Sequence, residues 1–493
     1  MRMFGPKRSG PRQKPSPTSF NPGKASHFSP KIPRPSPGGE VKCADYDPTM
    51  IRSRTIWLRL AGLTLLALGL GMATNTLDPA LLSFKVAELA PANRNTALGL
   101  ITAAGLLVAT LTQPIIGALS DRTRAPLGRR IPYMIVGSLL AVAFLFVVAL
   151  APTVGFLLLG VLAYQFGANT AQAPWQALLP DQLPASLRGA ASGFKSLFEI
   201  LGFILGRRIA GYMVAQGTPQ AAILSASAVL IVTTAVTALA ARYWRANRIP
   251  AVSEKEIDSL PPGQIQSEGA PGMDGEARPG ISAFLHRKNW PRGFGWWFVN
   301  RALFWAAIIA LNLFVIFYMV DVVGMTFSEA SRLFGDLSVV LGVSLLVITI
   351  PAGRLSDKFG RRPILLAACL VAVAGNLLIL GARTRPVLIL GGGALGLATG
   401  IFLSASWALA TDLVPRGMAA VYLGIANIAT AGGSFIARLA GGALIDPINR
   451  LTGRQEAGYL TLYSLTLVAF VIAAFAVTRM EVGEEHRSTQ PGV

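Results

Sequence analysis

The sequence is poor in charge, histidine and cysteine. Charged residues make up 14% of its 493 positions and hydrophobic residues 52%, which is unlike an ordinary soluble domain. The histidines, His27, His286 and His486, lie outside the apolar runs, so none is placed to relay protons within a membrane. Cys43 and Cys369 give neither a disulfide framework nor the ligand spacing of a metal site. No cofactor fingerprint and no cluster of nucleophile and base appears, so we expect no cofactor, no metal and no enzymatic activity.

Long apolar runs take up most of the chain. A helix needs about 20 residues to cross ~30 Å of hydrocarbon, and twelve runs meet this length. They are too long for barrel strands, and backbone groups in lipid must be bonded internally, so we predict an all-α membrane protein. The predicted spans are 56–77, 96–119, 131–151, 154–178, 189–214 and 220–243, then 295–320, 328–352, 363–382, 386–410, 417–445 and 457–478.

The formal net charge of +20 would suit a nucleic-acid-binding protein, but its placement argues against one. Most positive residues between the spans collect in alternate loops, as the positive-inside rule predicts, and the exceptions on the outer side are Arg383, Arg385, Arg450 and Arg454. We therefore expect a multi-pass protein of a cell membrane, such as a bacterial inner membrane, with both termini cytoplasmic and no nucleic-acid partner. The cytoplasmic positives are Arg122, Arg124, Arg129, Arg130, Arg188, Arg242, Arg245, Arg354, Lys358, Arg361, Arg362 and Arg416.

The spans divide six and six around a polar segment. Residues 1–50 form a basic tail rich in Pro, Ser and Gly, a composition typical of disorder, and Met50 is an alternative start. The predicted domains are a first six-helix bundle at 51–243, a cytoplasmic linker at 244–294, a second six-helix bundle at 295–479 and a tail at 480–493.

Two phrases occur once in each half, in the same order. The first places an acid between a glycine and a later Gly-Arg-Arg, and the second places an acid before a proline and an Arg-Gly pair. Because both recur in the same order, we infer an internal duplication. The phrases comprise Gly117, Asp121, Gly128, Arg129, Arg130, Asp181 and Arg188 in the first half and Gly353, Asp357, Gly360, Arg361, Arg362, Asp412 and Arg416 in the second.

The first phrase resembles the loop signature of the major facilitator superfamily, and the resemblance covers all twelve spans. Four extra residues separate Asp121 from Gly128 relative to the second copy, a long form similar to the glycoside-pentoside-hexuronide cation symporters and the related sucrose and proton symporters. Ile131 departs from the third basic residue usual in the sucrose group. The phrase that marks facilitative hexose porters after span six is absent.

The resemblance implies a monomeric secondary active transporter whose two halves rock to alternate access. It favours proton-coupled symport of a small saccharide or glycoside, with sodium as an alternative coupling ion. Export of a drug or metabolite is the alternative within transport. A non-transporting membrane assembly factor, as among the bacteriochlorophyll delivery relatives, is the alternative of another class.

The same resemblance implies that the repeated phrases gate the cytoplasmic face. An aspartate near a helix N-terminus, with arginines that reach carbonyls or acids, would hold helix ends together. The alternative is that the arginines only set topology. The gating candidates are the residues of the two phrases given above, together with Arg122 and Lys358.

Span five places ionisable groups on one helical face. Ser192, Lys195, Ser196 and Glu199 stand at i, i+3, i+4 and i+7, and ionisable residues within a span are functional candidates. Glu199, about 15 Å deep by its count of residues from Gly189, is the first candidate for reversible protonation, with Lys195 as its partner. The alternative is a static ion pair. Asp336 in span eight and Asp78 at the outer end of span one are further acid candidates. Because Asp78, Asp321 and Asp446 lie near helix ends, solvated helix caps are the favoured interpretation for these three.

Two other spans carry neutral polar faces that would suit a solute with many hydroxyls. Hydrogen bonds between helices are the competing explanation. Trp305 is a candidate for stacking on a sugar ring, and Trp175 is expected in an interfacial belt. The faces are Gln165, Asn169, Gln172 and Gln176 in span four and Asn427, Thr430, Ser434 and Arg438 in span eleven, and Asn75, Arg301 and Asn312 add polarity in spans one and seven.

Overall fold

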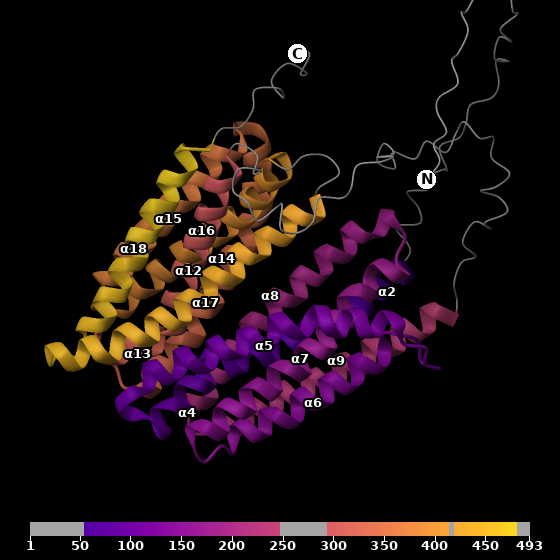
Figure 1. The fold of residues 1–493 in the computed structure, drawn as a ribbon, viewed down its shortest axis with the longest axis horizontal. Helices are drawn as coiled ribbons and strands as arrows, with labels where there is room; N and C mark the ends of the chain where they lie inside the picture. The colour runs from indigo at the N-terminus through magenta and orange to yellow at the C-terminus, as the bar shows by residue number, and fades with distance from the viewer. Residues whose placement is uncertain (1–53, 247–292, 414–418, 481–493) are drawn as a thin grey trace, which may run out of the picture. The chain divides into compact units, whose positions relative to one another are not determined.

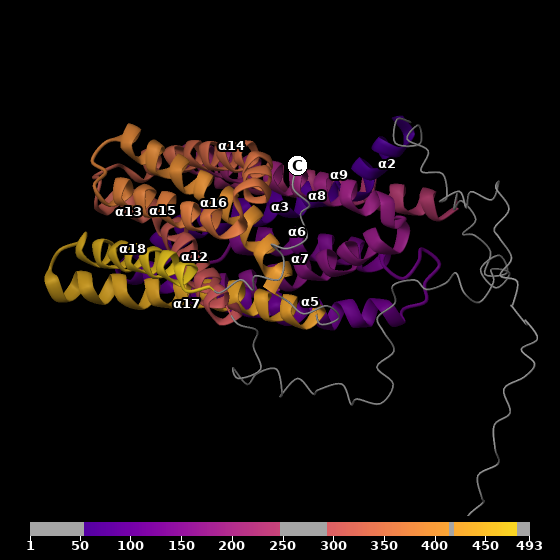
Figure 2. The same cartoon turned by 90° about the horizontal axis from the view of Figure 1, so that it is seen from above.

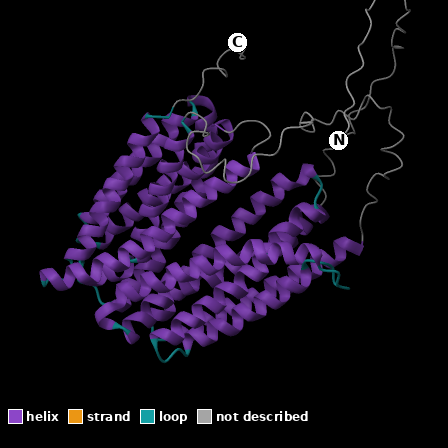
Figure 3. Cartoon of the chain, in the orientation of Figure 1, coloured by secondary structure: helices purple, strands orange, loops and turns teal. Residues whose placement is uncertain are grey.

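The computed structural model describes residues 54–246, 293–413 and 419–480. Within these ranges the chain is almost entirely helical and has no strand (Figure 3), so the predicted all-helical membrane fold is confirmed. The predicted tails and linker lie outside the described residues, apart from the few residues that adjoin α9, α12 and α18.

The helices fall into two sets that follow the internal duplication (Figure 1). The first contains α2 (Arg54–Thr64), α3 (Leu66–Thr76), η1 (Leu77–Leu81), α4 (Leu82–Leu89), η2 (Pro91–Asn93), α5 (Arg94–Arg122), α6 (Ile131–Ala149), α7 (Val154–Gln182), α8 (Ala185–Ala215) and α9 (Pro219–Ala246). The second contains α12 (Phe294–Leu313), α13 (Val315–Asp321), α14 (Phe327–Phe359), α15 (Arg361–Leu380), α16 (Arg385–Leu413), α17 (Ala419–Thr452) and α18 (Ala457–Thr478).

Eleven of these helical segments are long and apolar enough to cross a membrane. The remaining predicted span corresponds to α8, which has 31 residues but carries Arg188, Lys195, Glu199, Arg207 and Arg208. A helix with this many charges is costly in lipid unless it faces protein or a water-filled cavity. Helix α8, the most polar of the predicted spans, is therefore a candidate for contributing to a functional site.

Several helices extend further than predicted. The first span was expected to end at residue 77, but helical structure continues to Leu89 across a kink at Asp78, whose φ and ψ are −111° and 122°. Helix α17 likewise runs to Thr452, past its expected end at 445. Asp121 and Asp357 lie in the last turns of α5 and α14. The expectation that these two acids sit at helix N-termini was wrong, since they occupy the negative ends of the helix dipoles.

The two sets meet through two helix pairs. Helix α5 packs against α17, and α8 packs against α14, and both pairs lie side by side in the two views (Figures 1 and 2). In order along each half, α5 and α14 are the second spans, and α8 and α17 are the fifth. The contact is thus the same pairing of second with fifth span made twice, as duplicated halves related by a pseudo-two-fold axis would make it.

Glycines show where the two halves touch. We call the end that carries Gly128 and Gly360 the signature end and the opposite end the distal end. A Cβ added at Gly99, near the distal end of α5, would lie 2.4 Å from the Arg438 carbonyl oxygen of α17, whereas one added at Gly117 would meet nothing within 4 Å. On the distal part of α8, a Cβ at Gly211 would lie 2.4 Å from a backbone oxygen of α14. Close contact between the halves is therefore distal, and the structure is open toward the signature end.

Candidate substrate and coupling site

A cavity of about 440 Å³ lies between the two halves. Its wall is built by α3, α7 and α8 from the first half and by α12, α14 and α16 from the second. Four predicted substrate residues, Asn75, Gln172, Trp305 and Asn312, line it, together with Glu199. Its other lining residues include Thr74, Trp175, Phe203, Arg207, Thr399, Leu341, Leu345 and Leu403. Trp175 is buried and donates to the Leu63 carbonyl oxygen at 2.9 Å, so its predicted place in an interfacial belt was wrong.

Arg207 is held between two asparagines in this cavity. Its Nε donates to the Asn75 side-chain oxygen at 3.0 Å and its Nη1 to that of Asn312 at 2.7 Å. The guanidinium lies 4.3 Å from the ring centre of Phe203 and 5.3 Å from that of Phe334. Its partners are therefore neutral amides and aromatic rings, one asparagine from each half. Arg207 was missed by the sequence reasoning, although it stands two turns beyond Glu199 on the same helix.

Arg301 occupies a similar setting in the second half. Its Nε donates to the Thr430 hydroxyl at 2.9 Å and its Nη1 to the Ser406 hydroxyl at 3.2 Å. The guanidinium lies 4.4 Å from the ring centre of Trp407 and 5.5 Å from that of Trp297. Neither hydrogen-bond partner carries a charge, so Arg301 is a buried cation held by hydroxyls and indole rings.

Lys195 and Glu199 form an ion pair at 2.8 Å along one face of α8. The side chain of Glu199 is 40% exposed and that of Lys195 26% exposed, so water reaches the pair. Glu199 lines the central cavity, and Lys195 lines an adjoining pocket of about 370 Å³ with Gln176 and Ser192. The pair therefore links the cavity to the part of α8 nearer the signature end. Ser196 is exposed.

The polar face of α7 is divided between the cavity and the helix interface. Gln172 points to the cavity, but Asn169 donates to the Gln165 side chain at 3.2 Å and accepts from Gln113 of α5 at 2.8 Å. For Gln165 and Asn169 the competing explanation, hydrogen bonding around a helix interface, accounts for the residues as the structure places them.

The polar face of α17 is also divided. Thr430 accepts from Arg301, and Ser434 donates to the Thr430 carbonyl oxygen at 2.7 Å. Arg438 donates to Asp78 at 3.0 Å, across the two halves. Asn427 is exposed. One end of this face therefore binds the buried Arg301 of α12 through Thr430. The other end forms the ion pair between Arg438 and Asp78, which joins the two halves.

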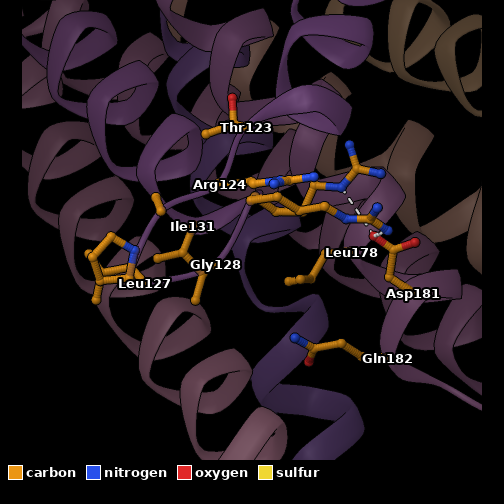
Figure 4. Close-up of a pocket in the computed structure, with 12 residues that line it drawn as sticks. Thr123, Arg124, Leu127, Gly128, Ile131, Leu178, Asp181 and Gln182 are labelled. Carbon is orange, nitrogen blue, oxygen red and sulfur yellow. Dashed lines mark hydrogen bonds and ion pairs between the residues drawn. The ribbon is translucent and has the colours of Figure 1, made fainter.

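The first signature loop forms an ion-pair cluster within its own half. Arg130 contacts Asp121 at 2.6 Å and Asp181 at 3.1 Å, and Arg129 contacts Asp181 at 2.8 Å. Figure 4 shows two arginine side chains converging on Asp181 beside a pocket of about 670 Å³. The cluster ties the signature ends of α5, α6 and α7 together. Arg122 is exposed and makes no part of these three pairs.

Arginines of the second signature loop donate to carbonyl oxygens of neighbouring helices. Arg361 donates to the Ala408 carbonyl oxygen, and Arg362 donates to that of Thr478 at 3.0 Å. Arg188, at the end of the other repeated phrase, donates to the Leu183 carbonyl oxygen at 3.2 Å. Asp357 and Lys358 are exposed. The side chain of Asp412 and all of Arg416 lie outside the described residues.

Glycine is required at one position of both signature loops. Gly128 and Gly360 have φ of 95° and 90°, a region that residues with a Cβ rarely adopt. Gly360 is the N-cap of α15, and Gly128 stands two residues before the N-cap of α6. Both copies therefore place a glycine of positive φ in the turn that leads into the next helix.

Acids at the distal end join the halves. Asp446 accepts from the Asn95 side chain at 2.8 Å and from the Thr96 amide at 2.7 Å, and Arg94 pairs with Asp321. With Asp78 bound to Arg438, the expectation that Asp78, Asp321 and Asp446 are solvated caps was wrong. Asp336, a proton-coupling candidate, pairs with Arg208 at 3.3 Å, and both side chains are about half exposed.

The chain matches a known family along most of its length. The family model described as Major Facilitator Superfamily matches residues 60–349 and 327–492. A search of curated proteins finds no match. Solved structures with this fold include a bacterial homologue of the human lysosomal transporter Spinster, in an inward-facing and unoccupied conformation, at 17% identity and a TM-score of 0.62, covering 86% of this chain and 97% of that one.

Two further structures support the same fold. The nucleoside transporter NupG aligns at 15% identity and a TM-score of 0.59, covering 85% of this chain and 98% of that one. A peptide transporter, POT, in complex with sulfate aligns at 17% identity and a TM-score of 0.59, covering 86% of this chain and 96% of that one. At these identities the likeness concerns the fold alone.

Proposed function

Because the chain belongs to the major facilitator superfamily, whose members are transporters, we propose that it is a proton-coupled symporter of a small saccharide or glycoside that works by alternating access. The observation that carries the proposal is the cavity between the halves, in contact with water at Glu199 and closed distally by helix packing. The basic loops support a cytoplasmic position for the signature end. The structure then corresponds to the state that faces the cytoplasm.

We assign the coupling proton to Glu199. In the present open state its carboxylate is paired with Lys195, as expected after a proton has left toward the cytoplasm. Rocking of the halves would close the signature end and open the distal end, so that Glu199 meets the other side of the membrane. A carboxylate that changes its access to water between two states can carry one proton per cycle.

Hydroxyl groups of the solute have neutral partners in the cavity. Gln172, Thr399 and the Trp305 ring line it, and the buried indole N–H of Trp305 has no hydrogen-bond partner among the described residues. A buried donor without a partner is costly, so an acceptor on the solute that reached it would be favoured. A saccharide would present both a ring face and oxygen atoms to these groups.

Uptake into proteoliposomes with an imposed pH gradient tests the proposal. Glu199→Gln should abolish gradient-driven uptake of a saccharide panel but keep exchange of labelled for unlabelled solute, because exchange needs no net proton movement. Asp336→Asn is the matched control, since its half-exposed pair lies outside the cavity lining, and it should keep gradient-driven uptake. Gradient-driven uptake that survives Glu199→Gln at the parent rate would remove Glu199 from coupling.

A second candidate is export of a drug or metabolite, favoured by the apolar part of the wall. Phe203, Leu341, Leu345 and Leu403 face the cavity and would suit a solute with an apolar portion. Exchange of lipophilic solutes with no response to saccharides would favour this candidate. Stable co-purification with a pigment complex, with no solute binding at all, would favour an assembly factor.

A further inference from the structure

Arg207, which lines the cavity, and Arg301, which is buried beside it, form no ion pair with a carboxylate in the part of the chain that the structure describes. Arg207 is 8% exposed and Arg301 is 3% exposed, and their hydrogen-bond partners are amides and hydroxyls. A buried charge is costly unless it is paired, and a charge kept in a membrane span marks a functional site. Asp78 acts electrostatically on Arg207, but it is already paired with Arg438, so Arg207 and Arg301 have no carboxylate of their own when the cavity loses its water.

The charges around the cavity do not balance. Asp78 pairs with Arg438 and Glu199 pairs with Lys195, so each of these pairs is neutral. Arg208 and Asp336 form another neutral pair. Arg207 and Arg301 remain, which leaves an excess of two positive charges over the paired groups.

Arg207 is oriented for a ligand at the closed end of the cavity. Its Nε and Nη1 are bound by Asn75 and Asn312, and no hydrogen bond from Nη2 is present among the described residues. Two aromatic rings flank the guanidinium plane. A fixed guanidinium with a free donor suits an oxyanion, which accepts charge-assisted hydrogen bonds in a defined direction.

Arg301 and Asn312 share one face of α12. Arg301, Trp305, Ile308 and Asn312 stand at i, i+4, i+7 and i+11, and the last three line the cavity. Eleven residues of helix span roughly 16 Å, so Arg301 lies toward the signature end and Arg207, bound to Asn312, lies at the distal floor. The unpartnered N–H of Trp305 stands between them.

We propose that the transported solute is an organic anion whose carboxylate or phosphate oxygens bind Arg207 at the floor of the cavity, while the positive charge of Arg301, buried nearer the open end, adds to the electrostatic attraction. The proposal rests on the proposed function only in taking the cavity as the transport site. Pairing with a bound anion reduces the charge excess as the cavity closes, so a charged solute favours closure more than its neutral analogue does.

Matched solutes test the charge requirement on the purified full-length protein. Sorbitol and gluconate share a carbon chain but differ by a carboxylate, and glucose and glucose 6-phosphate differ by a phosphate. Adipate carries carboxylates without hydroxyls. We expect at least one anion to raise the unfolding temperature and to bind roughly 10- to 100-fold more tightly than its neutral analogue. Equal binding of charged and neutral partners, or no binding by any of the anions, would overturn the proposal.

Variants separate binding of the anion from loss of folding. Arg207→Gln should remove most of the preference for the anion over its neutral analogue, and Arg207→Lys should keep part of it. Arg208→Gln is the matched control on the next residue of α8, and it should keep the full preference, because Arg208 already pairs with Asp336. The readout is the ratio of two affinities in one variant, which general destabilisation does not change. An unchanged ratio in Arg207→Gln would exclude Arg207 as the anion site.

The outcomes also distinguish this inference from the proposed function. Gradient-driven uptake of sorbitol or glucose, with no preference for their anions, would contradict the inference and support saccharide symport. Uptake of adipate with no response to saccharides would support the anion site and contradict the saccharide class. Anion uptake that ignores the pH gradient would support the anion site and contradict proton coupling.

Discussion

Gly99→Ala should shift the protein away from the state seen here. Gly99 and Gly117 both belong to α5 and stand five helical turns apart, so they share one face. A Cβ at Gly99 would lie 2.4 Å from the Arg438 carbonyl oxygen and 3.0 Å from the Cα of Gly442, and a Cβ at Gly117 would meet nothing within 4 Å. The two positions therefore form a matched pair at opposite ends of the same helix.

The size of the shift follows from what the new methyl group meets. The neighbours of Gly99 are backbone atoms of α17, which cannot yield unless the helix itself moves. Overpacking of this kind costs about 1–3 kcal/mol, which changes an equilibrium between two conformations roughly 5- to 150-fold. The gain in helix propensity from glycine to alanine is the same at both positions and in both states. In the state seen here, the clash at Gly99 is what separates the two variants.

Distances between pairs of spin labels, measured by electron–electron double resonance, would report the shift between the two conformations. Labels at the exposed residues Leu127 and Phe359 report the separation of the signature ends, in a background with Cys43→Ser and Cys369→Ala. We expect Gly99→Ala to move the population toward shorter distances and Gly117→Ala to leave the long distance in place. Identical distributions for the parent and Gly99→Ala, in folded protein, would refute the view that distal packing holds this state.

Two further predictions concern the distal acids and the signature turns. Asp446→Asn should open the distal end, because a neutral amide cannot replace charge-assisted hydrogen bonds of about 1.5–3 kcal/mol each. The opening would appear as a longer distance between spin labels at Glu88 and Leu451. An unchanged distance would contradict this prediction. Gly360→Ala should lower the free energy of unfolding by about 1–3 kcal/mol, because its φ of 90° and ψ of 155° lie in a region that is almost exclusive to glycine. Gly353→Ala adds a Cβ that meets nothing within 4 Å and should leave the free energy of unfolding unchanged. Equal unfolding temperatures for Gly360→Ala and Gly353→Ala would contradict the strain expected at residue 360.

The fold followed from the sequence because a bilayer imposes a length and a polarity on every span. Helix ends did not follow as well. Asp78 and Asp446 each precede a proline, and both were taken as the ends of apolar runs, yet helical structure continues past them. Charged residues at such places were then assigned to solvent. The error came from equating the end of an apolar run with the membrane surface.

The site was predictable where one helix carries it and not where two halves share it. Lys195 and Glu199 stand one turn apart, so helical periodicity brought them together. The bond between Asp78 and Arg438 joins residues 360 positions apart, and no local pattern relates them. Arg207 was within reach of the same periodic argument that found Glu199, because it continues the polar side of α8 by two turns.

Gly117 and Gly353 lie toward the signature ends of α5 and α14, and we infer that they contact the opposite half in the other conformational state. Gly335 and Gly353 of α14 stand 18 positions apart, the same interval as Gly99 and Gly117 of α5, and 18 residues make five turns. The distal member of each pair lies close to the opposite half: a Cβ at Gly335 would be 3.3 Å from backbone atoms of Arg208, and one at Gly353 would meet nothing within 4 Å. Each second span thus carries one small residue at either end of a single face. If the halves alternate as proposed, the distal ends separate and the signature ends approach each other. We then expect Gly117 and Gly353 to make the close contact with the opposite half, so Gly117→Ala should stabilise the present state.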